Sequence, residues 1–225
     1  KRMNPIISPQ QTRMVLFDLD GTLVDTAHDL GYALNLQRAR HGLADLPHEV
    51  IRPYASHGSV GLLSIGFNLT SEDAAFSSMR EEYLALYDQV LARAPVLFDG
   101  IEALLKQLEA QSLDWGVVTN KPRRFTVPLL QSIGLMSRAA CVVCGDDAVE
   151  PKPHPATLLL ACAQTNIKPQ DCWYVGDAER DIQAGRAAKM KTAVAMYGYL
   201  DAADRPAEWG ADAFVSAPEE VLKLL

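Results

Sequence analysis

The sequence lacks any long run of apolar residues. Although 48% of its 225 residues are hydrophobic, no stretch approaches the ~18–20 consecutive apolar residues that a helix needs to cross a bilayer. The first 13 residues contain two prolines and no apolar segment of the kind that marks a signal peptide. We therefore expect a globular protein without membrane contact, with residues 1–13 as a tail, disordered or not native, outside the fold.

Positive charge is in deficit. The chain has 21 lysines and arginines against 28 aspartates and glutamates, which gives a formal net charge of −7 at pH 7. An acidic chain lacks the broad positive field that attracts nucleic acid or anionic lipid, so we expect no nucleic-acid partner. An anionic substrate would then be held by a few local cationic side chains or by a metal ion.

Cysteine is scarce, with four residues in the whole chain. Without a signal peptide, these cysteines favour a reducing cytoplasm. Cys141 and Cys144 form a Cys-x-x-Cys pair, which occurs in redox sites and as half of a zinc site. No second pair and no histidine pair supplies the missing zinc ligands. We favour the interpretation that both are small apolar residues of a buried strand.

Short, continuously apolar runs predict the strands. Because polar residues do not alternate within them, both faces of each strand should be buried, as in a parallel sheet. The six runs lie at residues 14–18, 115–119, 140–144, 172–177, 191–196 and 213–215. From residue 95 onward, patterns with helical spacing separate the runs, as at Ile101, Leu104 and Leu108. This alternation predicts an α/β fold, a doubly wound parallel sheet of the Rossmann-like type.

The segment before residue 95 interrupts this alternation with helical patterns alone. Apolar residues recur at helical spacing over residues 30–37 and again over residues 76–90. Between them, residues 56–61 form a glycine-bearing turn. The predicted domains are an α/β core and one inserted α-helical cap domain: residues 14–25 with 95–225, and residues 26–94.

Polar residues follow the predicted strands, at the edge where a doubly wound sheet binds its ligands. After the first strand, Asp18 and Asp20 are two positions apart and so point the same way in extended chain. Two such carboxylates repel unless a cation or a shared proton intervenes. One can attack phosphorus while the other, protonated, donates to the leaving oxygen. The alternative is structural, with Asp20 or Thr22 as the cap of a helix.

Two further groups offer phosphate ligands. Thr119 and Asn120 follow a predicted strand and provide a hydroxyl and a backbone N–H, or else cap the helix that begins near Pro122. Lys152 lies between two prolines, which fix the backbone around it. Its ammonium could neutralise a phosphate and the nucleophile. Lys121, which also follows a strand, is the competing candidate.

The last group is acidic. Asp177 ends a predicted strand, and Asp181 follows four positions later, on the same face if a helix begins here. With Asp18, these residues provide the oxygen ligands that Mg²⁺ prefers, and Mg²⁺ usually keeps waters and a phosphate oxygen as well. Glu179 is either an outer ligand of the metal or a solvated side chain.

Four motifs in this order resemble those of the haloacid dehalogenase-like superfamily. They are Asp-Leu-Asp-Gly-Thr-Leu-Val-Asp at 18–25, Thr-Asn-Lys-Pro at 119–122, Pro-Lys-Pro-His-Pro-Ala at 151–156 and Gly-Asp-Ala-Glu-Arg-Asp at 176–181. Within it the chain looks most like the phosphoglycolate phosphatase group. It is also similar to bacterial N-acetylmuramic acid 6-phosphate phosphatases. One position departs from many members, which carry a serine where this chain has Ala178.

The resemblance implies Mg²⁺-dependent hydrolysis of a small phosphate monoester through an aspartyl-phosphate. The substrate would be 2-phosphoglycolate or a sugar phosphate such as N-acetylmuramic acid 6-phosphate. The implied roles are Asp18 as nucleophile, Asp20 as general acid and base, Thr119 as phosphoryl ligand and Lys152 as counter-charge. The implied metal ligands are Asp18, the backbone carbonyl of Asp20 and Asp177. Asp181 would contact these ligands or metal-bound water and would not bind the metal directly.

Other activities share this pattern. A phosphomutase would keep all four motifs, and a non-catalytic relative could bind a phosphate ligand, although such relatives usually lose the nucleophile or the lysine. A dehalogenase has no alkoxide to protonate and would not need Asp20. We expect the partner to be a small phosphorylated metabolite, and the chain to be a monomer or a homodimer.

Substrate choice should depend on the predicted cap. Its glycine-bearing turn offers His57, Gly58 and Ser59 as substrate contacts, in addition to Asn120 of the core. Gly58 and Gly61 let backbone approach a ligand closely. Arg52 could pair with a carboxylate on phosphoglycolate or on the muramic lactyl group. The alternative is that the glycines merely join two helices and that Arg52 is solvated.

Overall fold

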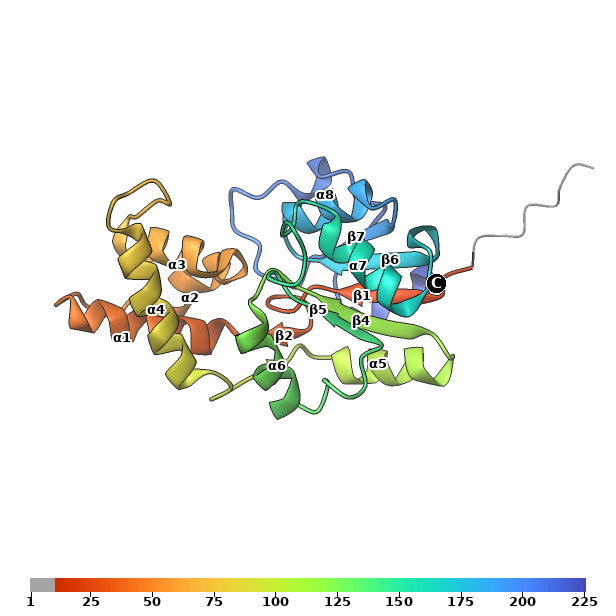
Figure 1. Ribbon diagram of the computed structural model, residues 1–225, viewed down its shortest axis with the longest axis horizontal. Coiled ribbons are helices and arrows are strands. Elements are labelled where there is room, and N and C mark those ends of the chain that lie inside the picture. Colours follow the sequence, from red (N-terminus) through yellow and green to blue (C-terminus); the bar gives the residue numbers. More distant parts are fainter. Residues whose placement is uncertain (1–10) are drawn as a thin grey trace, which may run out of the picture.

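A six-stranded parallel sheet forms the centre of the computed structural model, which describes residues 11–225 (Figure 1). The strands lie in the order β5-β4-β1-β6-β7-β8. In chain order they are β1 (Met14–Phe17), β4 (Asp114–Val118), β5 (Cys141–Val143), β6 (Cys172–Gly176), β7 (Lys191–Ala195) and β8 (Ala213–Val215). Each neighbouring pair is parallel, so the predicted doubly wound α/β sheet is confirmed. Residues 1–10 of the predicted tail lie outside the described residues.

Helices cover both faces of the sheet (Figure 1). One face carries α5 (Ile101–Ala110) and α6 (Arg123–Ser132), and the other carries α7 (Ala156–Thr165) and α8 (Glu179–Ala187). Val15 and Phe17 of β1 pack with the first pair, whereas Met14 and Leu16 pack with the second. A strand covered on both faces is apolar at every position, which explains the continuous apolar runs. No helix of the described chain is both long and apolar enough to span a membrane.

A helical insertion, residues 27–90, lies between β2 (Val24–Asp25) and β3 (Val96–Leu97), which form a short antiparallel pair. Figure 1 shows it standing beside the sheet. Its elements are α1 (Ala27–Arg40), α2 (His48–Ile51), the 3₁₀ helix η1 (Arg52–His57), α3 (Gly58–Phe67) and α4 (Phe76–Val90). Phe125 and Tyr199 of the core belong to the same apolar cluster as the insertion's buried side chains. The insertion therefore packs directly against the core.

The predicted helices near residues 30–37 and 76–90 are confirmed as α1 and α4. The predicted turn at 56–61 is wrong in part, because α3 begins at Gly58. Gly58 has a φ of 57° and marks the bend between η1 and α3. Gly61 is already helical, and a Cβ there would lie 2.7 Å from the carbonyl oxygen of Tyr54. A glycine at position 61 therefore allows close packing between η1 and α3 and does not form a turn.

Short elements were not predicted, because a few residues carry no detectable periodicity. Besides β2, β3 and α2, they are the 3₁₀ helices η2 (Pro169–Asp171), η3 (Pro206–Glu208) and η4 (Pro218–Leu224).

The interpretation of the cysteine pair as buried apolar residues is confirmed. Cys141 lies in β5 and Cys144 follows it, and both are free and buried. Burial raises the pKa of the Cys141 thiol to about 12 and that of Cys144 to about 11, so neither resembles a reactive thiolate.

Candidate active site

The carboxyl edge of the sheet brings the predicted residues together. Because β1 lies between β4 and β6, Asp18, Thr119 and Asp177 become neighbours, each directly after its own strand. Lys152 reaches the same edge from the loop after β5, and its Nζ lies 3.0 Å from Oδ1 of Asp18. This is the edge at which parallel α/β sheets bind their ligands.

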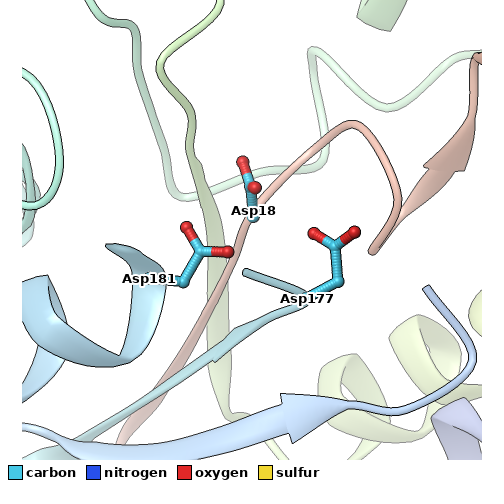
Figure 2. A group of neighbouring side chains, drawn as sticks. All are labelled: Asp18, Asp177 and Asp181. Atoms are coloured by element: carbon cyan, nitrogen blue, oxygen red, sulfur yellow. The ribbon is translucent and has the colours of Figure 1, made fainter. Parts of the chain in front are cut away.

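Three buried carboxylates face one another at this edge, as Figure 2 shows. One oxygen each of Asp18, Asp177 and Asp181 lies within 4.8 Å of the others. Burial, together with repulsion between the neighbouring aspartates, raises the pKa of Asp18 to about 6 and that of Asp177 to about 7. A cation among these oxygens would relieve the repulsion. The cluster therefore fits a metal-ion site with oxygen ligands.

Asp181 already has a counter-ion. Its Oδ1 lies 2.8 Å from Nζ of Lys152, whose side chain is fully buried, and its Oδ2 accepts a hydrogen bond from the N–H of Ala178 at 3.0 Å. Burial raises the pKa of Asp181, but the charges of Lys152 and Arg180 and the hydrogen bonds that Asp181 accepts together outweigh burial, so the pKa lies below its ordinary value. The charge of Asp181 is therefore already compensated, whereas the raised pKa values of Asp18 and Asp177 mark the two carboxylates whose charge a cation would still stabilise.

Asn120 holds Lys152 through its main chain. The side-chain amide donates to the carbonyl of Lys152, and its oxygen accepts from the N–H of Lys152, both at 2.8 Å. The ammonium of Lys152 is fixed in turn by the hydroxyl of Tyr174 at 2.7 Å and the carbonyl of Val118 at 3.2 Å. Asn120, predicted as a substrate ligand, is thus seen to position the lysine, and its contact with substrate stays a prediction.

Lys121 and Lys152 both reach the site, although the sequence presented them as competitors. Nζ of Lys121 lies 3.0 Å from Oδ1 of Asp20 and 4.7 Å from the centre of the Tyr87 ring. Thr26 donates its hydroxyl to the same oxygen of Asp20. Lys152 therefore forms ion pairs with the acidic cluster, whereas Lys121 forms an ion pair with Asp20.

A cavity of about 600 Å³ lies between this edge and the helical insertion. A volume of this size suits a small organic ligand. The core residues that line it include Asp18, Asp20, Thr119, Asn120 and Lys121. The predicted insertion residues that line it are His57, Gly58 and Ser59.

Arg52 is not among the described residues that line this cavity. Its Nη2 lies 3.7 Å from Oδ2 of Asp25, and its guanidinium lies over the ring of Tyr199, 4.8 Å from the centre. The structure thus places Arg52 beside Asp25 and outside the lining of the cavity, and its binding of a substrate carboxylate stays a prediction. Arg80 of α4 and Arg180 of α8 line the cavity instead, and sequence reasoning missed both.

Comparison with known proteins identifies the family. A family model described as haloacid dehalogenase-like hydrolase matches residues 15–195. The chain belongs to this family. N-acetylmuramic acid 6-phosphate phosphatase of Pseudomonas aeruginosa is 41% identical, over 95% of this chain and 94% of its own length. Phosphoglycolate phosphatase of Xylella fastidiosa is 39% identical, over 96% of this chain and 94% of its own length.

The solved structures agree on the fold of this haloacid dehalogenase-like hydrolase. A crystal structure of a predicted phosphoglycolate phosphatase from Haemophilus somnus 129pt is 24% identical. It superimposes with a TM-score of 0.83 over 96% of this chain and 99% of that one. The predicted resemblance is confirmed. The predicted class, a hydrolase of phosphate monoesters, is confirmed as well, because both curated relatives are named phosphatases.

Other hydroxyls reach the acidic cluster of this hydrolase, although Ala178 supplies none. Thr22 and Ser56 donate their hydroxyls to Oδ1 of Asp177, at 3.3 Å and 3.2 Å. The N–H of Tyr199 donates to Oδ2 at 2.9 Å. Asp177 is therefore oriented by three donors, one of which comes from the insertion.

Arg180 links the hydrolase core to the insertion. Its Nη2 donates to the carbonyl of Ser56 and to its Oγ, at 3.0 Å for the latter, and its Nη1 lies 3.1 Å from Nδ1 of His57. Arg180 could have been noticed in the sequence, because it is the one basic residue within the acidic motif at 176–181. Its partners His57 and Ser56 lie 123 and 124 positions earlier, so the motif could not identify them. The neighbouring Glu179 is exposed and accepts from Gln183 at 3.3 Å, outside the acidic cluster.

Proposed function

We propose that this hydrolase is a Mg²⁺-dependent phosphatase that transfers the phosphoryl group of a small phosphorylated metabolite to Asp18 and then to water. The proposal rests on the pairing of Asp18 with Lys152 beside Asp177, at the edge of a cavity that also contains Asp20. A buried carboxylate needs such a neighbour to stay ionised and nucleophilic. The N–H of Leu19 donates to the same oxygen of Asp18 at 2.8 Å and helps to orient it.

The acidic cluster supports the assignment of Mg²⁺. Asp18 and Asp177 would supply carboxylate oxygens, and the family resemblance adds the backbone carbonyl of Asp20. Asp181 stays with Lys152, to which both its charge and its geometry bind it. When bound, Mg²⁺ supplies positive charge that stabilises the oxygens of the transferred phosphoryl group.

Asp18 and Asp20 have different roles in the proposed reaction. Asp18 forms a bond to phosphorus while the bond between phosphorus and the leaving oxygen breaks, and Asp20 gives its proton to that oxygen. Asp20 then takes a proton from a water that attacks the aspartyl-phosphate, which releases inorganic phosphate and restores Asp18. Lys121, 3.0 Å from Asp20, stabilises the ionised Asp20 that this second step requires. Thr119 and Lys152 bind the phosphoryl oxygens.

We assign residues 26–94 as a cap over a core that comprises residues 14–25 and 95–225. The cavity is lined from both sides, so a phosphoryl group at the core edge would place the leaving group against the insertion. The names of the relatives supply two candidate leaving groups, from 2-phosphoglycolate and from N-acetylmuramic acid 6-phosphate.

Phosphate release tests the proposal. The purified protein is assayed with Mg²⁺ on 2-phosphoglycolate, N-acetylmuramic acid 6-phosphate and p-nitrophenyl phosphate. We expect inorganic phosphate to be released in amounts equal to the ester consumed, with the activity lost in a chelator and restored by Mg²⁺. A phosphomutase would isomerise a phosphate ester without net release, and a phosphate-binding relative would bind without turnover. Either result would contradict the proposal.

A further inference from the structure

One face of α4 forms a wall of the cavity beyond the core edge. The residues of this helix that line the cavity are Arg80, Tyr83, Leu84 and Tyr87. Their spacing of three and four positions places them on one face of the helix. The wall is therefore largely apolar, with a guanidinium at its N-terminal end.

Tyr87 marks the catalytic end of this wall. Nζ of Lys121 lies 4.7 Å from the centre of the Tyr87 ring and 3.0 Å from Oδ1 of Asp20. Arg80 lies two helical turns earlier in α4, which places it about 10 Å further along the helix axis. Helical side chains lean toward the N-terminus of their helix, so the side chain of Arg80 extends away from the catalytic end.

Arg80 still has hydrogen-bond donors to offer. Its Nε donates to Oγ of Ser59 at 3.1 Å, and no hydrogen bond or ion pair of residues 11–225 uses its Nη1 or Nη2. The other cationic residues that line the cavity, Lys121 and Arg180, are engaged by Asp20 and by the insertion. A pair of guanidinium N–H groups is therefore available at the end of the cavity remote from the proposed chemistry.

We propose that Arg80, oriented by Ser59, binds a carboxylate on the leaving group of the substrate and thereby selects a sugar-sized acid. Two N–H groups of a guanidinium match the two oxygens of a carboxylate. One guanidinium and one hydroxyl carry a single positive charge, which suits a carboxylate better than the dianion of a second phosphate. The inference rests on the proposed function, since it takes the phosphoryl group to lie at Asp18.

The length of the wall distinguishes the candidate leaving groups. In 2-phosphoglycolate, three bonds separate phosphorus from the carboxylate carbon, which is roughly 4 Å, whereas the backbone of Arg80 lies about 10 Å along α4 from that of Tyr87, and its side chain extends further in the same direction. A 6-phosphorylated amino sugar that carries its acid on an ether substituent of the ring separates the two charged groups by many more bonds and would reach further along the wall. Its ring would contact Tyr83 and Leu84, and the cavity of about 600 Å³ accommodates a ligand of that size.

Four esters separate the effect of charge from that of length. N-acetylmuramic acid 6-phosphate carries the acid on a sugar, N-acetylglucosamine 6-phosphate is the same sugar without the acid, and 2-phosphoglycolate is an acid without the sugar. The fourth, p-nitrophenyl phosphate, reports the chemical step alone. The ratio kcat/KM is measured for wild type, Arg80→Ala and Arg80→Lys. Arg40→Ala is the matched control, because this arginine of the insertion lies outside the cavity, 3.8 Å from Glu82.

We expect wild type to prefer the sugar acid over both the neutral sugar and 2-phosphoglycolate. Arg80→Ala should lower kcat/KM for the sugar acid about 10- to 100-fold, which corresponds to the loss of a hydrogen bond to a charged group. In the same variant, kcat/KM for the neutral sugar and for p-nitrophenyl phosphate should change by less than about twofold. Arg80→Lys should recover part of the loss, since it keeps the charge but not the fork. Arg40→Ala should behave as wild type.

Three results would overturn the assignment of Arg80: a wild type that does not discriminate by charge and length, equal losses on both sugars, or no loss on the sugar acid. Each of them is observed only if phosphate is released from some ester. A protein that releases phosphate from none of the four would instead refute the proposed phosphatase. Equal melting temperatures of wild type and Arg80→Ala exclude misfolding as the cause of a loss.

Discussion

Arg180 of α8 is hydrogen-bonded to Ser56 of the insertion, with its Nη2 3.0 Å from the hydroxyl of Ser56 and a second bond to the carbonyl. The same hydroxyl donates to Oδ1 of Asp177 at 3.2 Å. One residue of the insertion therefore contacts both a cation of the core and a carboxylate of the acidic cluster. The placement of the insertion and the geometry of the proposed metal site are linked, because movement of Ser56 would remove a donor from Asp177.

Ser56→Ala should weaken activation by Mg²⁺. We expect the half-saturating Mg²⁺ concentration to rise about 10-fold, because donors that orient a metal ligand commonly affect affinity by that factor. Arg180 keeps its bond to the backbone carbonyl, so the fold should persist. Phosphate release is measured against Mg²⁺ concentration. Ser78→Ala is the control, since that hydroxyl bonds the carbonyl of Ala75 on an exposed part of α4. The same Mg²⁺ requirement in both variants would contradict the role of Ser56.

Asp18→Asn should abolish turnover and preserve the fold. An amide has the shape of the carboxylate but is a poor nucleophile, so we expect kcat to fall at least about 1000-fold. Hydrolysis of p-nitrophenyl phosphate and the circular dichroism spectrum provide the two measurements. Asp45→Asn, at an exposed position of the insertion, should leave both unchanged. Turnover near the wild-type rate in Asp18→Asn would refute the proposed nucleophile.

Lys152→Met should destabilise the protein more than Lys121→Met. Removal of the fully buried ammonium of Lys152 leaves Asp18 and Asp181 without their counter-ion. Loss of one partner of a buried ion pair typically costs about 3–5 kcal/mol. Lys121 and its partner Asp20 are less completely buried, so water can replace part of that interaction. Urea unfolding in the presence of a chelator measures both free energies of unfolding, and a larger loss for Lys121→Met would contradict this ranking.

Mg²⁺ should stabilise the fold more at about pH 8 than at about pH 5.5. The pKa of Asp18 is raised to about 6 and that of Asp177 to about 7, so the folded, metal-free protein binds these protons more tightly than the unfolded chain does. The stability due to these two groups is therefore greatest at low pH and falls as pH rises through both values. Above them both carboxylates are charged and Mg²⁺ relieves their repulsion, whereas at low pH it must displace protons.

Thermal melting with a chelator and with Mg²⁺, at each pH, measures this difference. Asp177→Asn removes one of the two titrating carboxylates, so its melting temperature in chelator should depend less on pH in this range. The Mg²⁺-induced shift should also shrink in this variant, because one ligand is lost. A larger Mg²⁺ shift at the lower pH in wild type would show that the two carboxylates do not titrate as the fold implies.

The sequence by itself determined the strands and the carboxylates at their ends. The residues of β1 are apolar at every position because both faces of the strand are covered, and such a pattern can be recognised within a few adjacent residues. Asp18 and Asp177 directly follow their strands. Since parallel strands end at one edge of the sheet, the strand pattern placed both carboxylates at that edge. That β1 lies directly beside β6, which makes the two carboxylates neighbours, is a property of the tertiary structure.

Only the tertiary structure decided which charged side chains meet. Arg52 and Arg80 both belong to the insertion, and no local pattern distinguishes them. Arg52 pairs with Asp25 of β2, whereas Arg80 lines the cavity. Arg180 meets Ser56 across 124 positions of the chain. These pairings depend on how the insertion packs against the core, and that packing is determined by many contacts spread over both parts of the chain. The periodicity that predicts a strand or a helix is, in contrast, a property of neighbouring residues.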